Sequence, residues 1–258
     1  MGIVLGVIGG GGSILTVPIL VYLMGVAPET ATGYSLLIVG LTAGFGAIRY
    51  FKQGLIDIPA SIAFAIPSII SVYLSRAYLM PNIPEQLMSS PFVVNKNVAI
   101  MVLFAILMLV SATFMLKKAY AKTPFENPLH HEGDEHSTNW LLIMLEGAVV
   151  GVVTGVLGAG GGFLIIPALV LLMGMPMHKA VGSSLFIIAL KSLLGFIGDI
   201  QSGIYIDVPM IPIILVATFV GMLLSTRIAS KLDGKSLQKV FAFFTLIIAV
   251  VIISKEVL

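Results

Sequence analysis

The stretch Gly158-Ala159-Gly160-Gly161-Gly162, which continues through Phe163-Leu-Ile-Ile to Pro167, decides the fold of this chain. It interrupts a run of nearly uncharged, apolar residues that extends from Trp140 to Met173. A glycine cluster breaks a helix, and flanks this apolar do not leave the membrane or the core to form a surface loop. We therefore expect a break inside a membrane segment.

The length of this segment predicts the shape of the break. As one helix, residues 140–173 would be about 51 Å long at 1.5 Å per residue, against a hydrocarbon core of about 30 Å. A hairpin or re-entrant pair of short helices that turns at the glycines fits the membrane better. A second cluster, Gly9-Gly10-Gly11-Gly12, is again followed by a small apolar run and a proline, Pro18.

The two clusters belong to an internal repeat. An offset of 149 residues aligns Gly9 with Gly158 and Pro18 with Pro167, and it gives 21 identities over the 49 positions from residue 6 to residue 54. The chain is therefore a tandem of two homologous halves, residues 1–116 and 140–258, joined by a linker, residues 117–139.

The composition indicates a membrane protein. Of 258 residues, 58% are hydrophobic and 10% are charged, against about 25% charged in soluble domains. The net charge of +2 comes from residues scattered over short loops, so a nucleic acid is not an expected partner, whereas the lipid bilayer is. No basic residue precedes the first apolar run, so we expect the N-terminal segment to be retained and not cleaved as a signal peptide.

Six further apolar segments are long enough to cross a membrane. They cover residues 31–48, 58–79, 98–116, 180–197, 208–228 and 237–253. The predicted fold is an all-α polytopic membrane protein of two repeats, each with a glycine-broken re-entrant or hairpin segment followed by three transmembrane helices.

The basic residues predict the orientation. If each broken segment turns back on itself, one side carries ten of them: Arg49, Lys52, Lys117, Lys118, Lys122, Lys179, Arg227, Lys231, Lys235 and Lys239. Only Arg76, Lys96 and Lys255 lie on the other side, so the rich side is expected to be cytoplasmic. Each half then crosses the membrane an odd number of times, and the two repeats are inverted relative to one another.

The linker is polar and would be cytoplasmic. It contains three histidines and three carboxylates between His130 and His136, which could hold a divalent metal. A short solvated run lacks the fixed geometry of a structural site, so we expect a plain linker with no metal.

The glycine clusters are candidate anion sites. A broken helix frees backbone N–H groups and directs a positive helix end into the gap, and glycine lets a small ligand approach the backbone. The alternative is that the glycines only permit a tight hairpin or close helix packing. The candidate ligand residues are Gly9, Gly10, Gly11, Gly12, Ser13, Gly158, Gly160, Gly161 and Gly162.

Lys191 is the one charged residue deep inside an otherwise apolar span. A lysine at a helix centre costs about 2.5–3.5 kcal/mol on insertion scales, so it should face a cavity or a partner. We expect it to bind an anion or to pair with Glu146 or a backbone carbonyl. Its repeat counterpart is Thr42, so the halves differ at this position.

Hydroxyl residues begin the helices that follow the two breaks. They are Thr32 and Ser35 in the first half, and Ser183 and Ser184 in the second. Such residues either cap the helix or contact a ligand. Asp57 precedes a span that opens with a proline and should act as its N-cap. Arg76 should be an interfacial anchor that snorkels.

The doubled motif resembles a known family. Gly6-Val-Ile-Gly-Gly-Gly-Gly-Ser-Ile-Leu-Thr-Val-Pro18, followed by Gly25 and Thr32-Gly-Tyr-Ser, is echoed by Gly155-Val-Leu-Gly-Ala-Gly-Gly-Gly-Phe-Leu-Ile-Ile-Pro167, Gly174 and Gly182-Ser-Ser. Both halves are similar to the TauE/SafE sulfite exporter family. The resemblance implies transport of sulfite or small organosulfonates across the inner membrane of a bacterium or archaeon. It also implies that the glycine runs and the Ser/Thr motifs bind the anion.

These observations predict a secondary transporter that exports a small sulfur-containing anion by alternating access. An anion channel with the same glycine-lined path, or a membrane partner protein without its own flux, would fit the same sequence. An enzyme is not expected, because the chain has no cysteine and its four histidines lie in loops. We expect no cofactor, since no nucleotide-binding loop is present. Paired small-residue faces would permit a homodimer.

Overall fold

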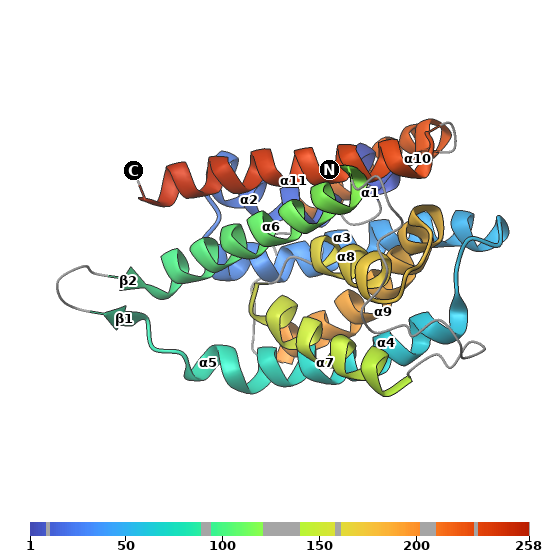
Figure 1. Ribbon diagram of the computed structural model, residues 1–258. Coiled ribbons are helices and arrows are strands. Elements are labelled where there is room, and N and C mark those ends of the chain that lie inside the picture. Colours follow the sequence, from blue (N-terminus) through green and yellow to red (C-terminus); the bar gives the residue numbers. More distant parts are fainter. Residues whose placement is uncertain are drawn as a thin grey trace.

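The computed structural model describes residues 1–8, 11–88, 94–120, 140–157, 161–201, 210–229 and 232–257. Among these residues, six helices are long and apolar enough to cross a membrane. They are α3 (Pro28–Lys52), α4 (Ile58–Leu74) with its extension to Asn82, α6 (Lys96–Tyr120), α7 (Trp140–Leu157), α9 (Met177–Gln201) and α11 (Gly234–Val257). The predicted all-α polytopic fold is confirmed (Figure 1).

The remaining elements are short or less apolar. α10 (Met210–Ala229) covers most of the fifth predicted span, 208–228, although its apolar part, Met210–Ser225, is shorter than the others. The extension of α4 consists of a π-helical turn, η2 (Ser75–Leu79), and α5 (Met80–Asn82). A small antiparallel hairpin of β1 (Gln86–Met88) and β2 (Val94–Asn95) then leads into α6 (Figure 1).

Elements of the same kind flank the break in both halves. In the second half, α7 is followed by α8 (Gly162–Pro167) and the π turn η3 (Ala168–Leu172). In the first half, α1 (Gly2–Ile8) is followed by α2 (Gly11–Pro18) and η1 (Ile19–Leu23). Each π turn begins directly after the proline and is closed by an N–H to C=O bond five residues back, Met24 to Ile19 at 3.2 Å and Met173 to Ala168 at 3.3 Å.

The first limb of the break differs from the expectation only in its length. The sequence predicted a hairpin or re-entrant pair of short helices that turns at the glycines; the helix does end there, but α7 has 18 residues and is long enough to span. The apolar run contains no breaker before the glycine cluster, so the helix continues up to it. Only the second limb, α8 with η3, is short.

The main helix pairs join the two halves. α4 packs on α7, α10 on α1, α9 on α3, and α11 on α6. Glycines let α7 come close to α4 and its extension: a Cβ added to Gly151 would lie 2.5 Å from Ser68 O, and one added to Gly155 would lie 2.8 Å from Ser75 Cβ. The glycine face of α7 that could have served a homodimer therefore packs on α4 within the chain.

The two central helices run antiparallel. Gly40 on α3 lies beside Leu193 on α9, Gly44 beside Ala189 and Gly46 beside Leu185. The residue numbers on α9 therefore fall as those on α3 rise. α6 and α11 are also antiparallel, because Gln238 near the start of α11 donates to Met115 O near the end of α6, at 3.0 Å.

The central pair is also the most buried part of the fold. In α3 and α9, 72% of the apolar window is buried, against 33–44% in the other spans. The peripheral helices expose apolar side chains instead, such as Ile62, Ile66 and Ile70 on α4, which lie one turn apart and face outward. This apolar outer surface is suited to contact with lipid. The polar side chains near the middle of α3 and α9 lie inside the protein instead.

Candidate functional site

Lys191 lies beside the helix break of the second half. Its side chain is 1% exposed, and its Nζ donates to Thr154 Oγ1 on α7 at 2.7 Å. A Cβ added to Gly161 would lie 2.5 Å from the same Nζ. The lysine on α9, the threonine on α7 and the glycine before α8 therefore meet at one point.

Gly161 is required at this point for two reasons. Its φ is +75°, in the left-handed region that other residues rarely adopt. A side chain there would also overlap Thr154 as well as the lysine. Its carbonyl oxygen accepts the N–H groups of Leu164 and Ile165, both at 2.9 Å, which fixes the first turn of α8.

The charge of Lys191 has no counter-charge nearby. Among the described residues, no carboxylate lies within salt-bridge distance of its Nζ. The predicted pairing with Glu146 is wrong, because both carboxylate oxygens of Glu146 lack a hydrogen-bond partner. Glu146 lies eight residues before Thr154 on α7, about 12 Å along the axis. A buried cation without a counter-charge is costly, so this arrangement is chemically suited to an anion.

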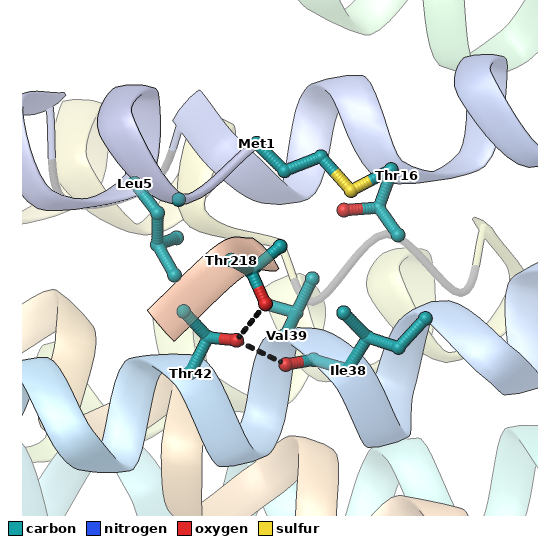
Figure 2. Close-up of a pocket in the computed structure, with 8 residues that line it drawn as sticks. Met1, Leu5, Thr16, Ile38, Val39, Thr42 and Thr218 are labelled. Atoms are coloured by element: carbon teal, nitrogen blue, oxygen red, sulfur yellow. Dashed lines mark hydrogen bonds between the residues drawn. The ribbon is translucent and has the colours of Figure 1, made fainter. Parts of the chain in front are cut away.

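The repeat-related position in the first half is a small cavity lined by no charged side chain (Figure 2). Thr42, the counterpart of Lys191, donates to Ile38 O at 2.7 Å and lies 3.1 Å from Thr218 Oγ1. Leu5, the counterpart of Thr154, also lines the cavity. The full lining is Met1, Gly2, Leu5, Thr16, Ile38, Val39, Thr42 and Thr218.

A buried ion pair lies at one end of the central helices. Arg76 Nη2 is 3.2 Å from Asp199 Oδ2, and Arg76 Nη1 donates to Thr32 Oγ1 at 3.1 Å. The prediction that Arg76 snorkels is wrong, since Arg76 is 4% exposed and Asp199 is 8% exposed. Asp199, on the neighbouring α9, compensates the guanidinium charge and makes this burial tolerable.

The chain matches the family described as sulfite exporter TauE/SafE over residues 1–252. The chain belongs to this family. It is 28% identical to a probable membrane transporter protein of Xylella fastidiosa (strain 9a5c) over 259 residues, which cover 98% of this chain and 91% of that protein. No solved structure was found that matches this chain.

Two further organisms contain relatives of this TauE/SafE protein. The probable membrane transporter protein YunE of Bacillus subtilis (strain 168) is 30% identical over 79% of this chain and 77% of its own length. The probable membrane transporter protein MJ0441 of Methanocaldococcus jannaschii is 26% identical over 92% of this chain and 87% of its own. With its six apolar helices, the chain is a multi-pass transporter of the plasma membrane.

The four hydroxyl residues predicted to bind ligand do not form one cluster. Ser183 Oγ accepts the N–H of Asp57 at 3.0 Å, and Ser184 Oγ donates to Val181 O at 2.8 Å. Thr32 binds Arg76 at the opposite end of the antiparallel pair. Ser35 is fully buried without a hydrogen-bond partner. The predicted N-cap is confirmed, since Asp57 Oδ1 accepts the N–H of Ala60 at 3.1 Å.

The glycine runs are only partly described. Gly9, Gly10, Gly158 and Gly160 lie outside the described residues, as does the linker with His130 and His136. Gly11, Gly12 and Ser13 begin α2, and Gly162 begins α8. Among the described residues, no three His, Asp or Glu side chains lie together as a metal ion would require. Contact of these residues with an anion stays a prediction.

Sequence reasoning missed Thr154 and Asp199. Thr154 is an ordinary hydroxyl in a span, and its importance arises only because it lies opposite Lys191, 37 residues away. Asp199 carried a usable signal, because an acidic residue eight positions after an intramembrane lysine, on the same helix, is rare in apolar segments.

Proposed function

We propose that this protein is a secondary transporter that exports a small sulfur-containing anion, sulfite or an organosulfonate, by alternating access. The carrying observation is the ammonium group of Lys191, which is buried beside a broken helix and has one hydroxyl partner and, among the described residues, no carboxylate partner. An oxyanion would supply the missing charge. The family description supports sulfite as the first compound to test.

The surroundings of Lys191 favour a small ligand. Thr154 and Gly161 approach the Nζ closely, so only a compact anion has room to bind once the three groups separate slightly. The hydroxyl of Thr154 can turn its hydrogen toward an oxyanion while its oxygen still accepts from the lysine. Ammonium and hydroxyl together would bind two oxygens of one sulfur group.

Alternating access is supported by the way in which the helices pair. The related helices α3 and α9 run antiparallel, as do α6 and α11. Antiparallel counterparts are what two inverted repeats, 1–116 and 140–258, would give. Each half also packs mainly on the other, so rocking of one set of helices against the other can open the buried site to either side. With the side that carries ten basic residues facing the cytoplasm, the linker 117–139 is cytoplasmic.

Transport by purified protein in proteoliposomes tests this proposal. We would measure uptake of radiolabelled sulfite, thiosulfate, sulfate, a sulfonate and acetate with wild type, Lys191→Met and the control Lys52→Met, whose lysine is exposed at the end of α3. Saturable flux of a sulfur anion with counterflow, lost in Lys191→Met and retained in the control, is the expected result. Flux that neither saturates nor shows counterflow would support a channel. Absence of flux for every anion would support a partner protein.

A further inference from the structure

The guanidinium group in the Arg76–Asp199 ion pair could also bind an anion. The guanidinium contacts a carboxylate oxygen on α9 at 3.2 Å and a hydroxyl on α3 at 3.1 Å. Arginine presents a fork of N–H donors, and this fork matches the oxygens of a small oxyanion as well as those of a carboxylate. Arg76 sits in the π turn η2, and such turns are frequent at functional sites.

Arg76 lies on a line from Lys191 toward one end of the central helices. Asp199 follows Lys191 by eight residues on α9, which is about 12 Å along the axis. α4 accompanies α9 over this distance, because a Cβ on Gly195 would lie 2.6 Å from Val72 Cγ1 and one on Gly198 would lie 3.5 Å from Arg76 Cβ. An anion that left Lys191 in this direction would reach Arg76 next.

Three buried hydroxyls lie on the helices that carry or contact the two cations. Ser35, Ser68 and Ser192 come from α3, α4 and α9, are fully buried and have no hydrogen-bond partner. Ser192 and Asp199 are seven residues apart, so they share one face of α9. A buried hydroxyl without a partner costs about 1–3 kcal/mol, so it marks a place that water or a ligand can occupy.

We propose that Arg76 is a second anion-binding residue of the transport path. In this conformation the carboxylate of Asp199 occupies the position on Arg76 at which the anion would bind. The inference rests on the proposed function, because its ligand is the small oxyanion that Lys191 binds. An anion that moves from Lys191 to Arg76 displaces Asp199 from the guanidinium. The displaced carboxylate then repels the anion and favours its exit. Displacement also releases η2 from α9 and loosens this end of the bundle.

Three variants separate an anion site from a structural ion pair. Asp199→Asn removes the competing charge and keeps the side-chain shape. The double variant Arg76→Gln with Asp199→Asn removes both charges, and the swap Arg76→Asp with Asp199→Arg exchanges them. All would be compared by kinetics of sulfite and thiosulfate flux in proteoliposomes, after size-exclusion chromatography and thermal unfolding in detergent have shown that they are folded.

An anion site predicts different kinetic effects for the single variant and for the two variants that change Arg76. Asp199→Asn should lower KM about three- to tenfold and lower kcat, because binding is freed from competition and release is slower. The double variant and the swap should lose at least tenfold in kcat/KM. Wild-type kinetics in a folded double variant or swap would show that the pair is only structural. A raised or unchanged KM in Asp199→Asn would overturn the inference even if the other two variants did not fold.

The same liposomes distinguish this inference from the proposed function. If wild type carries no anion, or if Lys191→Met retains full flux, the proposed function fails whatever the Arg76 variants do. If Lys191→Met loses flux while the double variant keeps it, only the second site is refuted.

Discussion

The two halves place elements of the same kind around a glycine cluster, but different side chains lie beside it. In the second half, Lys191 and Thr154 meet beside Gly161. In the first half, the equivalent positions are Thr42 and Leu5, which line the cavity in Figure 2. The backbone design is therefore shared, whereas the charge belongs to one half alone.

The two regions also differ in how complete they are. Thr42 donates to Ile38 O and lies at hydrogen-bond distance from Thr218, so its hydroxyl is satisfied within the protein. Lys191 has a hydroxyl partner, but among the described residues it has no counter-charge. The first half, in which the hydroxyl of Thr42 is satisfied within the protein, is interpreted as a scaffold. The second half, in which the ammonium group of Lys191 has no counter-charge among the described residues, is the better candidate for the anion site.

Lys191→Thr should give the largest effect, because it makes the second half resemble the first. We expect kcat/KM for the transported anion to fall at least a hundredfold, about 2.7 kcal/mol in transition-state stabilisation. The thermal unfolding temperature should not fall, because the change removes a buried charge that has no counter-charge. Flux and unfolding would be measured on the same preparation. Near wild-type flux would mean that the two halves do not differ in function at this point.

Gly161→Ala should have the next largest effect, and Gly174→Ala is its matched control. Both glycines have positive φ, 75° and 64°, so both alanines carry similar backbone strain of about 1–2 kcal/mol. Only the Cβ at Gly161 meets Lys191 and Thr154, since nothing lies within 4 Å of one at Gly174. We expect about thirtyfold lower flux for Gly161→Ala and less than threefold for Gly174→Ala. Equal losses in the two variants would assign the effect to strain alone.

The sequence was sufficient for the features that are visible along one helix. A glycine cluster inside an apolar run and a lysine at a span centre are local signals, and both led to residues that meet in the structure. The repeat, the helical fold and the family followed in the same way. The expectation of a short first limb did not hold, because the apolar run contains no breaker before the glycine cluster and the helix continues up to it as α7.

The missed contacts all connect distant parts of the chain. Arg76 lies near the end of a span, where a snorkelling arginine and a buried one look alike in sequence. Its partner Asp199 is brought to it only because α4 packs on α9 across the two halves. The hydroxyl motifs were found correctly as polar positions, yet the antiparallel packing places Thr32 and Ser183 at opposite ends of the central helix pair.

Thr154→Val should have an intermediate effect, because it makes the partner of Lys191 apolar, as Leu5 is in the first half. A hydrogen bond to a charged group contributes about 1.5–3 kcal/mol, so we expect roughly tenfold lower kcat/KM. Thr154→Ser keeps the hydroxyl and should recover most of the flux. A serine variant as impaired as the valine variant would indicate that the methyl group and its packing matter, and not the bond to Nζ.

Thr42→Val should have the smallest effect and tests the first half directly. The substitution removes the bond to Ile38 O, but Thr218 still has Ile214 O and Leu215 O as acceptors, both at 2.9 Å. We expect the free energy of unfolding to fall by about 1 kcal/mol and transport to stay within twofold of wild type. A loss as large as that of Lys191→Thr would contradict the assignment of scaffold and site. The first half would then contribute a ligand group through Thr42, and the anion would bind between the two repeat-related positions.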